Sequence, residues 1–258
     1  MNDGIINDPQ RRCSPLGAGG VRWAMIFAAG LGTRFKPWTD KHPKALALVN
    51  GKSLLQRNIE YLQQYGITEI VVNVHHFADQ IVNAIQQNNG WGSNIIISNE
   101  RDEVLETGGG LVKAKPYLQG DAFFTINVDI LTDANLASMK KLHGEKQAFI
   151  TLGVTDRTTS RYLLFDKNNR LCGWRNTATG DERIAIKVEK YFQKAYSGLA
   201  VFEPSVFNYI TQKGKFSLID VFLSNASQQK IIAFDHSSSK VLDVGKPESV
   251  SLAESMFP

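Results

Sequence analysis

A glycine-containing loop near the start of the chain has residue types that suit phosphate binding. The loop runs from Ala28 to Pro37 as Ala-Ala-Gly-Leu-Gly-Thr-Arg-Phe-Lys-Pro, and Pro43-Lys44 follows it. Its two glycines allow the backbone to approach a ligand closely and to direct N–H groups at phosphate oxygens. Arg34 and Lys44 add positive charge on long side chains. The loop therefore predicts a binding site for a phosphorylated ligand.

Two well-known glycine motifs do not fit this region. A dinucleotide-binding G-x-G-x-x-G fingerprint would need glycine in place of Phe35, which weakens an NAD-dependent dehydrogenase as an interpretation. A Walker A loop that ends in Gly51-Lys52-Ser53 would need glycine in place of Leu46. We therefore interpret Gly51 as part of a turn, with Ser53 as the N-cap of the helix that follows.

Two aspartates that are distant in the sequence each follow a short apolar segment. Asp129 ends the segment Asn127-Val128-Asp129, and Asp243 lies within Val241–Gly245. Ligands of open parallel sheets bind beyond the carboxyl ends of the strands, so Asp129 should face the same crevice as the glycine loop. Mg²⁺ is usually held by a few carboxylates together with phosphate oxygens. The pair therefore predicts a magnesium site, although single aspartates also form turns and helix caps.

The motif Gly30-x-Gly32-Thr33-Arg34, followed by Pro37 and Pro43-Lys44, resembles the signature of sugar-1-phosphate nucleotidyltransferases. The resemblance extends over about residues 23–256. It implies a Mg²⁺-dependent enzyme that joins a nucleoside triphosphate to a sugar 1-phosphate and releases pyrophosphate. A non-catalytic domain that only binds nucleotide-sugars is the competing interpretation.

The resemblance also implies a role for each matching residue. Arg34 and Lys44 would be catalytic, by charge stabilisation and phosphate bridging. Asp129 and Asp243 would hold the metal. The nucleotide would be bound by Ala29, Gly30, Gly32, Thr33, Thr107 and Gly108. The sugar phosphate would be bound by Asn127, Glu189, Lys190 and Gly198.

The segment Leu105–Gly110 resembles most the corresponding segment of uridylyltransferases that act on N-acetylmuramate 1-phosphate. UTP and N-acetylmuramate 1-phosphate are therefore the implied substrates, and a GTP-dependent mannose- or heptose-1-phosphate guanylyltransferase is the alternative. Thr107 is a candidate N-cap for the helix that should follow. A carboxylate such as Glu100 or Glu103 would favour guanine by accepting two adjacent donors, so the choice of base stays open.

Three further features leave alternatives open on the sugar side and in the family pattern. Glu189 and Lys190 match a charged pair of the family, but a solvated run of charges is equally typical of such a segment. Asp220 either binds sugar hydroxyls or caps a helix. Val128 and Leu242 depart from the family pattern, in which glycine and an aromatic residue are usual.

Apolar strands alternate with helices through the first half of the chain. We expect strands at 23–28, 70–74, 95–97 and 123–128. We expect helices at 53–64, 78–87 and 109–115. This alternation predicts an α/β fold with helices on both faces of a parallel sheet, and the family resemblance implies a Rossmann-like (GT-A-like), mostly parallel mixed sheet.

The second half contains strand-like segments that few helices separate. The expected strands are 149–154, 162–166, 171–174 and 200–202. The expected helices are 204–211, 218–226 and 247–255. We predict antiparallel additions that form a β-rich sugar-binding portion. The expected organisation is a flexible leader, 1–22, and a single nucleotidyltransferase domain, 23–258, which binds nucleotide up to about residue 130 and sugar phosphate from 131 onward.

The composition is that of a globular chain. Its 258 residues are 43% hydrophobic and 21% charged, and the net charge of +4 is too small to imply nucleic-acid binding. No stretch approaches the ~20 apolar residues of a membrane span, and the leader lacks the apolar core of a signal peptide. Cys13 and Cys172 form no CxxC motif, and HExxH and GxSxG motifs are absent. We expect a cytoplasmic protein, monomeric or dimeric, with no nucleic-acid or membrane partner.

Overall fold

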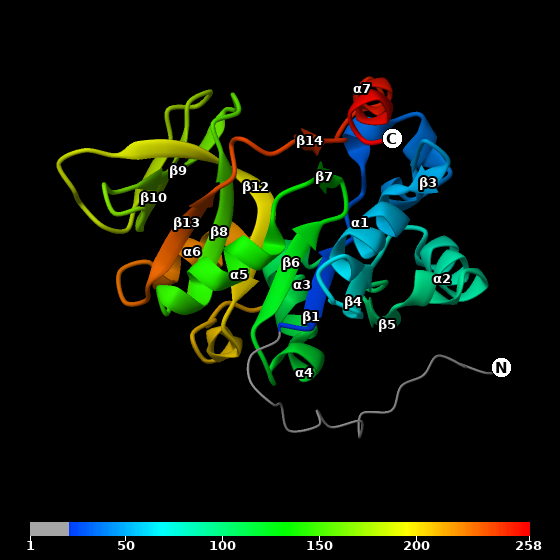
Figure 1. Cartoon of the computed structure of the whole chain (residues 1–258), viewed down its shortest axis with the longest axis horizontal. Helices are drawn as coiled ribbons and strands as arrows, with labels where there is room; N and C mark the ends of the chain where they lie inside the picture. The colour runs from blue at the N-terminus through cyan, green and yellow to red at the C-terminus, as the bar shows by residue number, and fades with distance from the viewer. Residues whose placement is uncertain (1–20) are drawn as a thin grey trace.

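The computed structural model describes residues 21–258, so the expected leader lies outside the described residues except for Val21 and Arg22. Within this range, ten strands form one mixed sheet, shown in Figure 1. Eight of them follow the order β11-β10-β9-β12-β6-β1-β4-β5, while β8 pairs with β12 and β13 pairs with β8. None of the helices in the described range is both long and apolar enough to cross a lipid bilayer.

The first half of the chain builds the parallel part of the sheet. Its strands are β1 (Trp23–Phe27), β4 (Glu69–Val74), β5 (Asn94–Asn99) and β6 (Phe123–Asn127). β1 pairs in parallel with β4 and β6, and β4 pairs in parallel with β5. Phe27 lies opposite both Asn73 and Asn127, so β1 and β6 end at the same edge of the sheet. The predicted parallel sheet is confirmed, because strands buried on both faces read as continuous apolar runs.

The second half adds mostly antiparallel strands, as predicted. These are β8 (Ile150–Thr155), β9 (Arg161–Phe165), β10 (Leu171–Asn176), β11 (Glu182–Ile184), β12 (Phe192–Phe202) and β13 (Ile231–Asp235). β12 is antiparallel to β6, β8 and β9 and so joins the two halves. The strand expected at 200–202 begins eight residues earlier, at Phe192, and β11 and β13 were not expected.

Two small ribbons lie beside the main sheet. β2 (Leu48–Val49) pairs with β3 (Lys52–Ser53), and β7 (Ile130–Thr132) pairs with β14 (Val241–Asp243). The second ribbon brings the C-terminal part of the chain next to the end of β6, as Figure 1 shows. Its register places Asp243 opposite Ile130, the residue that follows Asp129.

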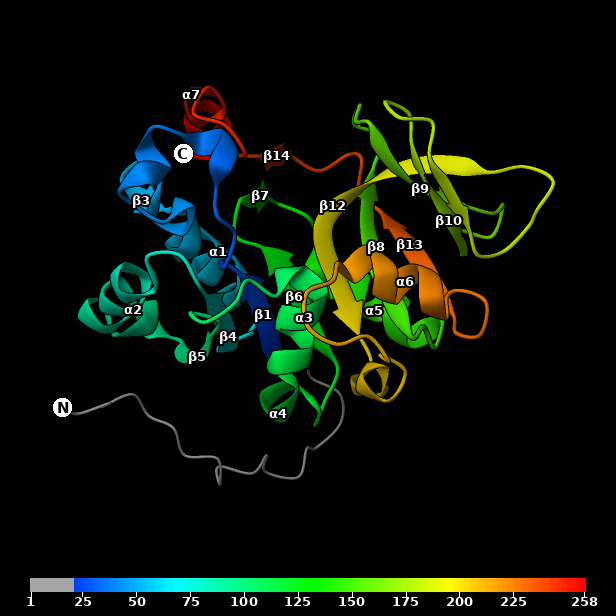
Figure 2. The ribbon, with the colours of Figure 1, turned by 180° about the vertical axis from the view of Figure 1, so that it is seen from behind.

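Helices cover both faces of the sheet. One core is shared by α1 (Leu54–Gln63), α2 (Ala78–Gln87), α5 (Leu136–Glu145) and α7 (Ser249–Met256). The other core is shared by α3 (Glu106–Lys113), α4 (Lys115–Leu118) and α6 (Leu218–Asn225), which lie in front of the sheet in Figure 2. The predicted two-sided α/β arrangement is therefore confirmed.

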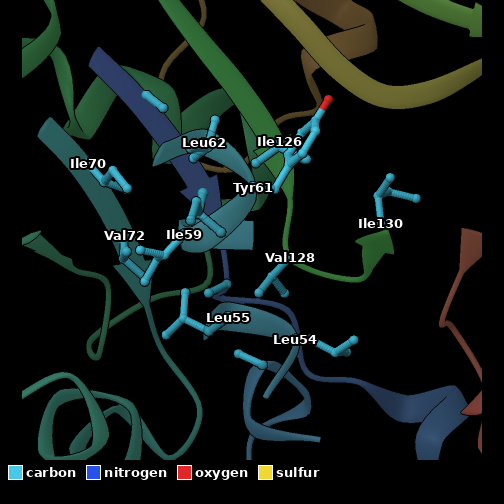
Figure 3. Close-up of a cluster of buried hydrophobic side chains, with 14 of the residues drawn as sticks. Leu54, Leu55, Ile59, Tyr61, Leu62, Ile70, Val72, Ile126, Val128 and Ile130 are labelled. Atoms are coloured by element: carbon cyan, nitrogen blue, oxygen red, sulfur yellow. The ribbon is translucent and has the colours of Figure 1, made fainter. Parts of the chain in front are cut away.

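The core beneath the glycine loop is built from aliphatic side chains of α1 and the parallel strands. Figure 3 shows Ile59 of α1 next to Val72 of β4, and both are fully buried. Ser53 caps α1 as predicted, because its hydroxyl accepts a hydrogen bond from the Gln56 backbone N–H at 3.1 Å. Truncating a buried leucine such as Leu62 would cost about 2–5 kcal/mol of unfolding free energy.

Some helix predictions were wrong in extent or kind. The helix expected at 109–115 begins earlier, at Glu106, and ends at Lys113. The helix expected at 204–211 is a short 3₁₀ helix, Pro204–Asn208. α5 was not predicted, because only Leu136 and Met139 among its apolar residues are buried and its sequence pattern is correspondingly weak.

Candidate active site

The carboxyl ends of β1 and β6 position the candidate site. The glycine loop leaves β1 immediately after Phe27, and Asp129 follows β6 two residues after Asn127. Because parallel strands end at a common edge, the loop and Asp129 face one another, as the sequence predicted. The crevice between them is lined by residues from both halves of the chain.

Two cation–carboxylate pairs lie at the centre of the site. Lys44 Nζ donates to Asp129 Oδ2 at 2.5 Å, and the Lys44 side chain is 90% buried. Arg34 Nη2 lies 4.0 Å from Asp243 Oδ2. The Val244 backbone N–H donates to the Asp129 carbonyl at 2.8 Å, which holds the segments that carry the two aspartates together. The four predicted charged residues therefore form one cluster.

Asp243 is the electrostatically strained member of this cluster. Burial, and then the neighbouring Asp129 carboxylate, raise the pKa of Asp243, while Lys44, Arg34 and Arg157 act in the opposite direction. Its Oδ1 atom is buried and has no hydrogen-bond partner among the described residues. A carboxylate in this state would be stabilised by an additional positive charge.

The glycine loop is held by its own turn and by a threonine. Gly32 has a φ of +61°, and a Cβ atom there would meet the Thr39 Cγ2 atom at 2.8 Å. The Thr39 hydroxyl donates to the Gly32 carbonyl at 2.9 Å. At Gly30 a Cβ atom would meet nothing within 4 Å, so packing within the described chain does not require glycine at that position.

Two cavities meet at the charged cluster. The smaller, of about 250 Å³, is lined on one side by Gly30, Gly32, Thr33, Lys44 and Thr107. The larger, of about 630 Å³, lies toward β9, β10 and β12 and includes Gly198 and Asp243. Arg34, Asn127 and Asp129 line both cavities. Two ligands could therefore bind side by side and share these three residues.

Gly198 keeps the larger cavity open near Asn127. Its φ is +80°, and a Cβ atom would lie 2.9 Å from both Asn127 Nδ2 and Ile130 Cγ1. A side chain at this position would therefore displace Asn127. The sequence predicted both residues on the sugar side, and the structure brings them together.

Four predicted site residues do not line either cavity. Glu189 and Lys190 are exposed before β12, and Lys190 Nζ lies 5.1 Å from the centroid of the Phe192 ring. Ala29 and Gly108 are buried. Their ligand roles stay predictions.

Packing against the segment before α6 explains the glycine at position 108. The Gly108 backbone N–H donates to the Phe216 carbonyl at 2.9 Å. A Cβ atom at Gly108 would approach the Phe216 ring to 2.4 Å. The space beside Gly108 is thus filled by Phe216.

The prediction that Thr107 caps its own helix was wrong. Thr107 lies inside α3, and its hydroxyl accepts a hydrogen bond from the Leu218 backbone N–H at 3.0 Å, at the start of α6. It links an edge of the smaller cavity to the helix that contributes Ile219 to the larger one. The capping alternative holds for Asp220, whose carboxylate accepts from the Ser217 backbone N–H at 3.0 Å.

Glu100 and Glu103, the candidate base-reading residues, are in opposite environments. Glu100 is fully buried, and its Oε1 accepts from Asn73 Nδ2 at 2.8 Å. Burial raises the pKa of Glu100, while the hydrogen bonds from Asn73 and the Leu105 backbone act against that shift. Asn73 Oδ1 in turn accepts from the Ala28 backbone N–H at 2.7 Å. Glu100 thus braces the start of the glycine loop, whereas Glu103 is exposed.

Sequence reasoning missed one wall of the larger cavity. This wall is lined by Arg157, Thr159 and Ser160 of the connection between β8 and β9, by Arg161 at the start of β9, and by Trp174. A polar segment between two apolar strands was a detectable signal of a loop. That this segment lies beside the site depends on the order of the antiparallel strands, which the sequence did not predict.

A buried serine–histidine pair supports the same cavity. Ser197 lines the cavity, and its Oγ lies 2.9 Å from His236 Nε2. Burial lowers the pKa of His236, which favours the neutral imidazole. His236 Nδ1 is buried and has no hydrogen-bond partner in the described part of the chain, so Ser197 is the only side chain that His236 contacts by a hydrogen bond there.

The chain is similar to known proteins over most of its length. The model of the family described as nucleotidyl transferase matches residues 23–256. N-acetylmuramate alpha-1-phosphate uridylyltransferase of Neisseria meningitidis serogroup B is 31% identical over 223 residues, which are 86% of this chain and 92% of that protein. Mannose-1-phosphate guanylyltransferase catalytic subunit beta of Drosophila pseudoobscura pseudoobscura is 27% identical over 231 residues, which are 87% of this chain and 59% of that protein.

A solved structure shares the fold. The crystal structure of HddC from Yersinia pseudotuberculosis complexed with GMP-PN matches with a TM-score of 0.74 and 23% identity, over 92% of this chain and 100% of that chain. The predicted Rossmann-like α/β class is thereby confirmed.

Proposed function

Because the chain belongs to the nucleotidyl transferase family, we propose that it transfers UMP from UTP to N-acetylmuramate 1-phosphate. Sugar-1-phosphate nucleotidyltransferase activity as such follows from the family and from its relatives. The choice of UTP and of the N-acetylmuramate acceptor rests on the relative that is 31% identical. The observation that carries the site assignment is the meeting of two cavities at Arg34, Asn127 and Asp129.

The proposed reaction is a single in-line displacement. A phosphate oxygen of the sugar 1-phosphate forms a bond to the α-phosphorus of UTP. The bond from the α-phosphorus to the bridging oxygen of the β-phosphate breaks, and pyrophosphate leaves with that electron pair. No protein nucleophile takes part, so positioning and charge stabilisation supply the catalysis.

The smaller cavity is the proposed nucleotide side. Its glycine loop directs backbone N–H groups toward the triphosphate, and the open space at Gly30 supports close approach of a ligand. Arg34 would stabilise the charge that develops on the leaving pyrophosphate. Lys44 would bridge phosphates of the two substrates. In this scheme residues 23–258 act as one catalytic domain.

The larger cavity is the proposed acceptor side. Asn127 and Gly198 line it next to the charged cluster, where the sugar phosphate must lie to reach the α-phosphorus. Glu189 and Lys190 lie outside this lining, so a direct role for them would require movement of the segment before β12.

We also propose Mg²⁺ as the cofactor, held by Asp129 and Asp243. The unpartnered Oδ1 atom of Asp243 and the raised pKa of this carboxyl group support a cation there. No group of three or more His, Cys, Asp or Glu side chains in residues 21–258 could hold a metal by itself. A pair of carboxylates, from Asp129 and Asp243, fits Mg²⁺, which commonly takes one or two carboxylates and completes its shell with water and substrate phosphates. When bound, the ion would neutralise negative charge on the reacting phosphates.

GTP-dependent transfer to mannose 1-phosphate or heptose 1-phosphate is the second candidate, favoured by the relative from Drosophila pseudoobscura pseudoobscura. Glu100 gives this alternative no support, because Asn73 and the Leu105 backbone already engage its carboxylate. Glu103 is exposed but lines neither cavity, so it gives this alternative no support either.

A substrate matrix tests the proposal. Purified protein is incubated with each of four nucleoside triphosphates and several sugar 1-phosphates, with and without Mg²⁺. Products are identified by mass and pyrophosphate by a coupled assay. We expect UDP-N-acetylmuramate to form fastest and EDTA to abolish turnover. A GDP-sugar as main product would establish the second candidate, and nucleotide-sugar binding without any pyrophosphate release would indicate a binding domain.

A further inference from the structure

Two arginines on the wall of the larger cavity have no carboxylate partner. Arg157 and Arg161 both line this cavity and both are exposed. Among residues 21–258, neither forms an ion pair, and the only polar side-chain contact of Arg157 is a 3.1 Å hydrogen bond from Nη2 to the Tyr196 carbonyl. Their positive charges are therefore available to a ligand.

Neighbouring cations of the antiparallel sheet are in a different state. Arg175 pairs with Glu182, and Arg183 Nη1 lies 2.7 Å from Asp220 Oδ1. Lys194 lies 2.7 Å from Asp156 and 2.6 Å from Asp235. The chain thus supplies carboxylates for these neighbours and leaves the two cavity arginines uncompensated.

The two arginines differ in how close they lie to the charged cluster. Burial and Asp129 raise the pKa of Asp243, and Arg157 acts weakly against that shift, so its charge reaches the catalytic cluster. Arg161 begins β9 and lies opposite Asn176, while Leu163 lies opposite Trp174. Because side chains alternate along strands, Arg161, Leu163 and Trp174 share one face, and all three line the cavity. That face combines a guanidinium group with an aromatic and an aliphatic surface.

This combination fits a particular acceptor chemistry. Arg34 and Lys44 already serve the phosphates, so a further cation away from them matches a second anionic group on the sugar. A carboxylate on a short hydrocarbon substituent could contact Trp174 and Leu163 through its carbon atoms and Arg161 through its oxygens. The planar guanidinium matches a carboxylate with two parallel hydrogen bonds.

We propose that Arg161 binds a carboxylate carried by the sugar of the acceptor and thereby selects acidic sugar 1-phosphates over neutral ones. The inference rests on the proposed function, since it takes the larger cavity as the acceptor side. It extends that function by naming the residue and the chemical group that decide acceptor choice.

The test compares two acceptors that differ by one acidic substituent. N-acetylmuramate 1-phosphate carries a lactyl ether with a carboxylate, and N-acetylglucosamine 1-phosphate has a hydroxyl group in its place. We measure kcat/KM for both with the wild-type protein and with Arg161→Gln, Arg161→Lys and Arg157→Gln. Arg175→Gln is the matched control, because it removes an arginine of the same sheet that does not line the cavity.

Loss of a charge-assisted hydrogen bond should reduce kcat/KM for the acidic acceptor by about 10- to 100-fold in Arg161→Gln. The kcat/KM for the neutral acceptor should fall far less, so the ratio of kcat/KM between the acidic and the neutral acceptor should decrease strongly. Arg161→Lys should keep part of the preference for the acidic acceptor, because lysine has the positive charge but lacks the planar guanidinium group. Arg157→Gln should reduce both acceptors together, and Arg175→Gln should keep the wild-type ratio.

Three outcomes would overturn the inference. Equal losses with both acceptors would place Arg161 on the phosphate, an unchanged ratio would remove it from selection, and a wild-type preference for the neutral acceptor would exclude an acidic substrate. Failure of the proposed function looks different, because no UTP and sugar 1-phosphate pair would then release pyrophosphate. In that case calorimetric binding of N-acetylmuramate 1-phosphate to wild type and Arg161→Gln still decides the role of Arg161. Circular dichroism and thermal melting check that each variant is folded.

Discussion

Lys44 and Asp129 are 85 residues apart in the sequence, yet their side chains form a 2.5 Å ion pair at the carboxyl edge of the sheet. Lys44 lies in the connection that follows β1, and Asp129 follows β6. The two strands are neighbours in the sheet, so the segments after them meet. The pair lies beside Asp243, whose pKa is raised by burial and then by Asp129, while Lys44 acts in the opposite direction. The predictions below test what this cluster does.

Asp129→Asn should reduce turnover by at least about 10²–10³-fold, because it removes a preorganised charge at the reacting phosphates. Arg34→Ala should lose a similar factor. Both changes affect partly exposed side chains, so thermal melting should show a folded protein. Pyrophosphate release under saturating substrates is the measurement. Near wild-type rates in either variant would remove that residue from the mechanism.

Asp243→Asn should raise the thermal midpoint in EDTA at neutral pH. The folded pKa of Asp243 is raised, so the stability it contributes is complete below its unfolded pKa of 3.8 and is lost as pH rises through the folded value. The variant avoids that loss, so its midpoint should lie above that of the wild type; in a chain of this size each 1 kcal/mol shifts the midpoint by roughly 2–4 °C. The difference should shrink toward pH 4.

Magnesium should reverse this ranking. The ion should stabilise the wild-type protein more than Asp243→Asn, because it binds the native state through that carboxylate. Melting curves with and without Mg²⁺ measure both effects. An identical magnesium shift in the two proteins would count against a metal at Asp243.

Gly198→Ala should raise the KM for the sugar 1-phosphate about tenfold and change the KM for UTP little. The added Cβ would meet Asn127 and Ile130 at 2.9 Å, and the residue would keep a φ of +80° at a cost of about 1–2 kcal/mol. Gly180→Ala is the control, since Gly180 has the same φ of +80° but a Cβ there meets nothing within 4 Å. If both variants alter KM equally, the contact with Asn127 is irrelevant.

Unfolding free energy should fall as pH drops below 6.5, in part because of His236. Burial lowers the pKa of His236 in the folded protein below its ordinary value of 6.5. Between the two pKa values, His236 is therefore protonated in the unfolded chain and neutral in the native state. One such group contributes up to about 1.4 kcal/mol per pH unit between the two pKa values. His236→Gln should flatten this acid-side slope. Urea unfolding at pH 7.0, 6.0 and 5.5 measures it.

Local patterns carried the general architecture. The apolar run that begins at Trp23, the Ser53 cap and the alternation of strands and helices predicted the parallel half of the sheet, because a strand buried on both faces must be apolar throughout. α5 escaped prediction because few of its residues are buried. β12 was predicted too short, because its first residues are exposed and its apolar pattern begins only later.

The residue types and their spacing were enough to predict the chemistry of the site: a glycine loop with two cations after β1, and two aspartates that follow short apolar segments. The tertiary structure decided several contacts that no local pattern indicated. It buried Glu100 against Asn73, brought the Thr107 hydroxyl to the Leu218 backbone N–H at the start of α6, and placed Arg157 and Arg161 on the wall of the larger cavity. The physical reason is that these contacts depend on strand order and on antiparallel register, which arise from packing between segments far apart in the chain.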